Sequence, residues 1–74
     1  MKTTDIKPGT TYAVSTFADY RGYAMPGRVV GIARSKVYVD VSVYDELDDR
    51  EVVERRIVRP QDIRETWDAY VAAS

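Results

Sequence analysis

The strongest constraint on the fold is a strict alternation of apolar side chains with mostly polar ones across residues 36–44. Every second position there is a valine: Val37, Val39, Val41 and Val43. Successive side chains of a strand point to opposite faces of a sheet, so this period of about two residues predicts a strand with one buried face. The opposite register would bury Asp40, and burying an unpaired charge costs far more than exposing valine. We therefore expect the four valines to face a core.

Three further segments are rich in β-branched and aromatic residues and are predicted to be strands as well: residues 10–15, 27–33 and 51–58. Gly31 inside the second of them indicates a bulge or a sharp bend. The dipeptide Arg34-Ser35 predicts a tight turn into the valine strand, and the acidic residues 45–50 predict a solvated hairpin tip. Between the first two strands, residues 16–26 are predicted to form a long loop that contains several aromatic side chains.

The C-terminal segment has a different period. The spacing of one helical stripe is found at Ile63, Trp67, Tyr70 and Val71. Pro60 suits a first helical turn, because its ring fixes a helical φ and that position needs no N–H donor. We therefore predict a helix over about residues 61–72. A helix this short is marginal in water on its own, so its stripe must be buried, either against the open end of the β domain or against a partner.

The order of these segments resembles a small SH3-like barrel. The residues that carry the likeness are KPG at 7–9, GRVVGIARSKVYVDV at 27–41 and RIVRPQDI at 56–63. In that family a Pro-containing helical turn precedes the last strand, so the resemblance implies such a turn around Pro60. The chain departs from the pattern in RETWDAYVAAS at 64–74, which is predicted to be a helix that either replaces the fifth strand or follows it.

The predicted architecture is a single, mainly β domain over residues 1–74. About four to five antiparallel strands are expected to form an SH3-like barrel over about residues 6–59, and the short C-terminal helix follows. So few strands in so short a chain must curl or lie against the helix to bury their apolar face.

The ending PQDIRETWDAY, which follows a valine-rich β segment, also resembles small proteins that are common in actinobacteriophage genomes. This second resemblance implies a viral accessory protein that acts in the cytoplasm of a bacterial host. It carries over no catalytic residue.

The chain contains no Cys and no His, which limits its chemistry. It has no thiolate nucleophile and no histidine base, and a zinc site would need carboxylates alone. The acidic residues 45–51 lack the spacing and the turn glycine of a calcium loop. We therefore expect no enzyme activity, no metal and no cofactor. No apolar run approaches the ~18 residues of a membrane span, and the start lacks the apolar core of a secretory signal, so we expect a cytoplasmic protein without membrane contact.

Aromatic residues supply the best candidate binding surface. SH3-like barrels recognise ligands with loop and strand aromatics, so the resemblance implies binding by Tyr20, Tyr23, Tyr38 and Tyr44, with the nearby Arg21 and Arg28. The alternative is that these rings, with Tyr12 and Phe17, cap a small core. A second basic group, interleaved with acids, predicts local salt bridges; its members are Arg55, Arg56, Arg59 and Arg64.

Three functions stay open at this point. The first is a non-enzymatic interaction module that binds a protein, in a phage context a host protein. The second is nucleic-acid binding through the aromatic and basic side chains of the first half, which the net charge of -1 and the acidic second half disfavour. The third is self-association as a homo-oligomer through an exposed strand edge or the helix. The helical stripe is either core or interface in each case.

Overall fold

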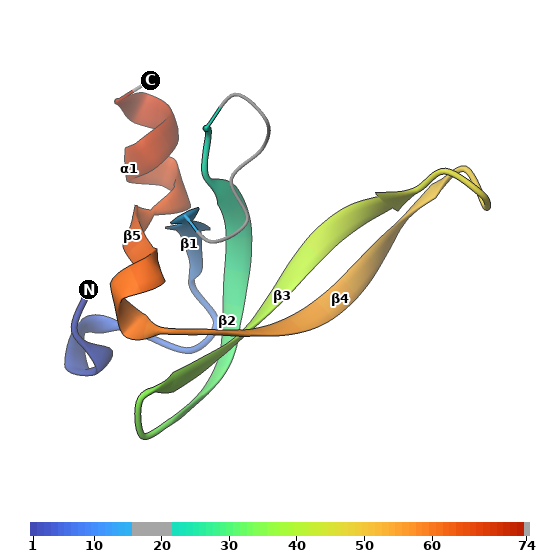
Figure 1. Ribbon diagram of the computed structural model, residues 1–74. Helices are drawn as coiled ribbons and strands as arrows, with labels where there is room; N and C mark the ends of the chain where they lie inside the picture. Colours follow the sequence, from blue (N-terminus) through green and yellow to red (C-terminus); the bar gives the residue numbers. More distant parts are fainter. Residues whose placement is uncertain (16–21, 74) are drawn as a thin grey trace.

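The computed structural model describes residues 1–15 and 22–73. Its elements follow one another as η1 (Thr3–Asp5), β1 (Thr11–Val14), β2 (Met25–Ala33), β3 (Lys36–Asp45), β4 (Arg50–Val58), η3 (Pro60–Asp62), β5 (Ile63–Thr66) and α1 (Trp67–Ala72), where η marks a 3-10 helix. The strands form one five-stranded antiparallel sheet in the order β4-β3-β2-β1-β5 (Figure 1). This confirms a mainly β fold with a short C-terminal helix. Within the described residues β4 and β5 lie at opposite edges and do not pair, so the sheet is not closed into the expected barrel.

β3 has the predicted register. Val37 and Val39 are fully buried and Val41 is nearly so, while Val43 is half-buried against the same core. Between them, Ser42 faces solvent on the other side of the strand. The alternation of the sequence is therefore an alternation between core and solvent, as the cost of burying a charge requires.

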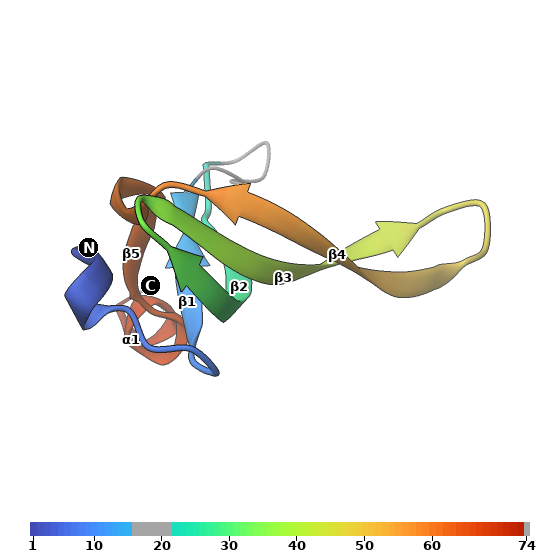
Figure 2. The same cartoon turned by 90° about the horizontal axis from the view of Figure 1, so that it is seen from below.

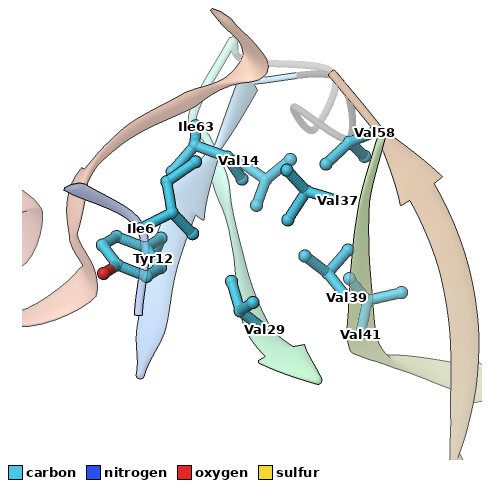
Figure 3. Packing of buried hydrophobic residues seen from close by; sticks show 9 residues of the cluster. All are labelled: Ile6, Tyr12, Val14, Val29, Val37, Val39, Val41, Val58 and Ile63. Atoms are coloured by element: carbon cyan, nitrogen blue, oxygen red, sulfur yellow. The ribbon is translucent and has the colours of Figure 1, made fainter. Parts of the chain in front are cut away.

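The core is one cluster to which every strand contributes (Figure 3). Its members are Ile6, Tyr12, Val14, Val29, Val37, Val39, Val41, Val58 and Ile63. Valine and isoleucine dominate because branched side chains pack well on a pleated surface. The Tyr12 hydroxyl accepts the backbone N–H of Lys7 at 2.9 Å, which satisfies the polar end of a buried ring. Tyr12 is thus a core residue, as the alternative interpretation of the aromatic group expected.

β2 contains the predicted irregularity. Its pairing with β3 shifts register between Val29 and Gly31, which confirms a bulge at this point. The following tight turn is also present, and Arg34 adopts a φ of 56° in it. β2 begins earlier than the sequence predicts because Met25 already pairs with Val14 of β1.

The C-terminal segment corrects the predicted helix over residues 61–72. Only α1 is α-helical, whereas η3 is the expected Pro-containing turn and β5 occupies the positions between them. Ile63 pairs with Val14 and is buried, so it belongs to the sheet and not to a helical stripe. The physical reason is the edge of β1, which offers backbone hydrogen-bonding groups that need partners. The helix therefore follows the fifth strand and does not replace it.

Polar groups define the ends of β5. The Thr66 hydroxyl oxygen accepts the N–H of Ala69 at 3.3 Å, an N-cap that begins α1. The N-terminal ammonium of Met1 donates to the carbonyl oxygens of Pro60 and Ile63, each at 3.1 Å. In Figure 1 the N-terminus lies on the side of β5 that faces away from β1. The N-terminal segment thus covers part of this edge of the sheet.

Candidate interaction surface

The long β3–β4 hairpin extends beyond the rest of the sheet (Figures 1 and 2). β2 pairs with β3 only as far as the partners Arg28 and Asp40, whereas β3 and β4 remain paired as far as Asp45 and Arg50. Beyond Val41, which still reaches the core, the hairpin has no third strand beside it in the described part of the chain. Residues 42–53 are called the ribbon below.

One face of the hairpin carries exposed apolar side chains. Directly opposite residues of antiparallel strands share a face. One face therefore consists of Tyr38, Asp40, Ser42 and Tyr44 of β3 with Ile57, Arg55, Val53 and Glu51 of β4, and it is called the outer face below. On it, Val53 is 68% exposed, Ile57 58% and Tyr44 57%. These side chains contribute little burial to the fold, so they are available for contact with another molecule.

The tip of the ribbon presents a leucine among acidic residues. Leu47 is 97% exposed in the turn that joins β3 to β4. The Asp45 carboxylate accepts the N–H of Leu47 at 3.0 Å and that of Asp48 at 3.4 Å, a side-chain-to-backbone pattern that fixes such turns. Asp49 has a φ of 51°, a left-handed conformation that Asp tolerates better than most residues. The predicted hairpin tip is confirmed, and the Asp45 carboxylate holds its backbone.

An ion pair lies in the middle of the outer face. The Arg55 Nε donates to the Asp40 carboxylate at 3.0 Å, and the two residues are cross-strand partners. The hydrogen bond to Asp40, followed by the attraction of its negative charge, raises the pKa of the Arg55 guanidinium above its ordinary value. Arg28 of β2 is the Cα partner of Asp40 on its other side. The outer face therefore combines apolar side chains with a locally balanced charge.

The remaining arginines of the second basic group also pair locally, as the interleaved acids predicted. The pairs are Arg56 with Glu54, Arg59 with Asp62 at 3.4 Å, and Arg64 with Glu65 at 3.8 Å. Each joins residues close in sequence, and each is partly exposed to solvent. Such pairs orient side chains on the surface and add little to stability.

The structure divides the predicted binding tyrosines among separate places. Tyr20 and Arg21, together with Phe17, lie outside the described residues. Tyr38 and Tyr44 share the outer face, where Tyr38 is half-buried and Tyr44 exposed. Arg28 joins them through its position beside Asp40.

Tyr23 belongs to another part of the molecule. It is exposed and precedes Ala24, whose N–H donates to the Tyr70 hydroxyl of α1 at 2.9 Å. The described tyrosines therefore do not form the single cluster that the sequence suggested.

The C-terminal helix packs through Tyr70. Its ring lies 5.4 Å from that of Trp67 between centroids, and the Arg64 guanidinium carbon lies 5.3 Å from the Tyr70 centroid. Trp67 and Tyr70 are half-buried, whereas Val71 is exposed. Of the predicted helical stripe, Ile63 lies in the core, the rings of Trp67 and Tyr70 contact each other outside the core cluster, and Val71 does not reach the core.

Three residues of this surface were not predicted from the sequence: Leu47, Val53 and Ile57. The sequence did indicate that Val53 and Ile57 share one face of a strand, because they alternate with the residues that β4 turns toward the core. Which of the two faces is open depends on the pairing with β3, which a single strand does not reveal. Leu47 lies between acidic residues, and the composition of that loop predicted only a solvated turn.

No pocket was found in the described residues, and no group of three or more acidic side chains there is arranged to hold a metal ion. No helix in residues 1–15 and 22–73 has the length and apolar character to cross a membrane. Comparison with protein-family models, with curated proteins and with solved structures found no match.

Proposed function

We propose that this protein is a non-enzymatic interaction module that binds a partner protein with the tip of its ribbon. The observation that supports this most strongly is the exposure of Leu47, the only leucine of the chain, at 97% in a turn fixed by Asp45. Tyr44, exposed on the outer face close to the same turn, adds an aromatic ring, a residue type enriched in protein interfaces.

The charges around Leu47 define the partner that would fit. The turn carries Glu46, Asp48 and Asp49 beside the leucine, and only Arg50 offsets them through a 3.8 Å contact with Asp48. Complementarity requires an apolar pocket with a basic rim on the partner. The resemblance to small actinobacteriophage proteins favours a protein of the bacterial cytoplasm as the owner of that pocket.

Nucleic-acid binding is the weaker proposal. An acidic tip repels phosphate, and on the outer face Arg55 is neutralised by Asp40. The arginine of the aromatic loop, Arg21, lies outside the described residues. We therefore expect no specific DNA binding at physiological salt.

The test compares capture of a host protein by three forms of the immobilised chain after nuclease treatment. The wild type and a Val71→Ser variant, whose substitution lies on an exposed position of α1, should retain one stoichiometric protein. The Tyr44→Ser/Leu47→Ser double variant should lose it while keeping the wild-type thermal melt. Capture that the double variant retains, or that nuclease abolishes, would contradict the proposal.

A further inference from the structure

The two edges of the sheet are protected to different degrees. β5 is only 4 residues long, runs directly into α1, and has the Met1 ammonium bonded to its Ile63 carbonyl. β4 is 9 residues long, contains no proline, and pairs with β3 in a continuous register without a bulge. In the described part of the chain no strand lies on the other side of β4. A long, regular strand of this kind is a template for pairing with another strand.

We propose that β4 pairs with β4 of a second copy of this chain, antiparallel and centred on Arg55, so that two sheets join into one. A symmetric antiparallel pair of identical strands must be centred on a residue that faces its own copy, and each residue then shares a face with its opposite. For each possible central residue, the symmetry therefore determines which residues of the two β4 strands lie opposite each other.

On the outer face, centring on Arg55 places Val53 opposite Ile57 of the second copy, and the symmetry repeats this pair. Both side chains are more than half exposed in the single chain, at 68% and 58%. Each would bury apolar surface against the other, which is a favourable cross-strand pair in antiparallel sheets. The two exposed patches thus cover one another.

On the opposite face, the same register places Glu54 opposite Arg56 of the second copy, again twice. Within one chain these two residues already form an ion pair, so the joined strands would carry four alternating charges. At the ends of the paired segment, Val52 falls opposite Val58. Apolar residues therefore meet apolar ones, and acids meet bases.

The central contact is between two copies of Arg55. Like charges directly opposite are unfavourable in a sheet. Here each guanidinium is bound by Asp40 of its own chain at 3.0 Å on the same face, so the repulsion is offset before the strands meet.

Other centres match less well. Centring on Glu54 places Glu54 opposite itself and Val53 opposite Arg55, and centring on Val53 places Arg50 opposite Arg56. A centre at Val52 pairs Glu54 with Arg50 but carries the contact out of β4 and into the turn. Arg55 is the centre that matches charge and apolarity together within the strand.

The joined sheet would leave the ribbon tips free. Because the two β4 strands run in opposite directions, the tips that carry Leu47 would point away from each other and present two binding sites at once. Tyr44 and Leu47 take no part in the pairing, so failure of self-association and failure of the proposed function are separate results.

The experiment is sedimentation equilibrium of the pure chain and of two charge-reversed variants. The wild type should be dimeric. Glu54→Arg and Arg56→Glu should each lose the dimer, because each places two further like charges across the joint. An equimolar mixture of the two variants should recover the dimer, because every substituted side chain then faces an opposite charge. Glu46→Arg makes the same change of charge at the tip, away from the joint, and should stay dimeric.

A monomeric wild type at the highest soluble concentration would overturn the proposal, and so would a mixture that remains monomeric. Should either variant fail to fold by circular dichroism, amide hydrogen exchange of the wild type decides the matter. Protection in β4 should then increase with protein concentration while that in β5 stays constant. Exchange in β4 that does not depend on concentration would refute the pairing.

Discussion

The ribbon continues two of the five strands, β3 and β4, beyond the rest of the sheet, which is called the body below, and the two regions differ in how far their apolar side chains are buried. In the body, Val37 and Val39 of β3 are fully buried in the core cluster. In the ribbon, Val53 and Leu47 face solvent. The body thus holds most of the core, whereas the ribbon, although Val43 packs against that core, exposes Val53 and Leu47, which contribute little burial to the fold. The ribbon therefore has the apolar surface that is most open to a partner.

The largest difference in stability is expected between variants that place a carboxylate on the core face and on the solvent face of β3. Val39→Asp should unfold the protein, because a buried unpaired carboxylate costs more than the ~5 kcal/mol that a small domain can lose. Ser42→Asp, on the solvent face, should leave the thermal midpoint within a few degrees of the wild type. Circular dichroism melts measure both. An unchanged midpoint for Val39→Asp would mean that the register of β3 is wrong.

Truncating an apolar side chain should also destabilise the protein far more in the body than in the ribbon. Ile63→Ala should destabilise the protein by about 2–5 kcal/mol, because Ile63 fills the buried junction between β1 and β5. Val53→Ala in the ribbon should change stability by no more than about 0.5 kcal/mol. Urea unfolding of both variants, at a concentration where the chain is monomeric, gives the free energies. Equal losses would show that Val53 contributes as much to the core as Ile63 does.

Two glycines of β2 offer a matched pair inside the body. A Cβ at Gly27 would lie 2.8 Å from Cγ2 of Val14, too close for the packing of β2 on β1, so Gly27→Ala should cost about 1–3 kcal/mol. Gly31 has nothing within 4 Å of that position and no positive φ, so Gly31→Ala should be neutral or stabilise by about 0.4–1 kcal/mol. Thermal melts that rank the two variants the other way would contradict this packing.

The smallest effect is expected where the body meets the ribbon. Asp40→Asn removes the acceptor for Arg55, and the resulting loss of stability should shrink when salt is raised from about 0.1 to about 1 M. Because the pKa of Arg55 is raised, its contribution is fully present below the unfolded-state pKa and is lost only as pH rises through the folded-state value. The difference between the two proteins should therefore be constant between about pH 6 and about pH 9. If the stability difference between the wild type and Asp40→Asn changed across this pH range, another titrating group would be responsible for it.

Much of the fold was predictable because it is encoded locally. The alternation of β3, the bulge near Gly31 and the acidic turn each depend on a few neighbouring residues, and each is present. The end of the chain was not predictable in the same way, because Ile63 fits the spacing of a helix and that of a strand equally well. The edge of β1, far away in sequence, decides between them.

The candidate surface was predictable only in part, for the same reason. Tyr38 and Tyr44 could be assigned to one face of β3 from the sequence alone, and they do share it. The length over which the hairpin projects depends on where β2 stops pairing, at Asp40, and this is set by the packing of the whole sheet. Val53 is exposed because it lies opposite Ser42 on the outer face, and the register of β4 against β3 sets this face, so no pattern within β4 alone contains it.

The pairing of β1 with β5 also determines how the chain must fold. It joins positions as distant as Tyr12 and Thr66, whereas β2, β3 and β4 are joined by short turns. Closing so long a stretch of chain is entropically costly, so we expect the two hairpins to form early and the β1–β5 contact to form last. During synthesis on a ribosome, β5, which completes the core, is the last of the five strands to emerge. Until then Val14 lacks its partner Ile63, and the nascent chain has the greatest need of protection from aggregation.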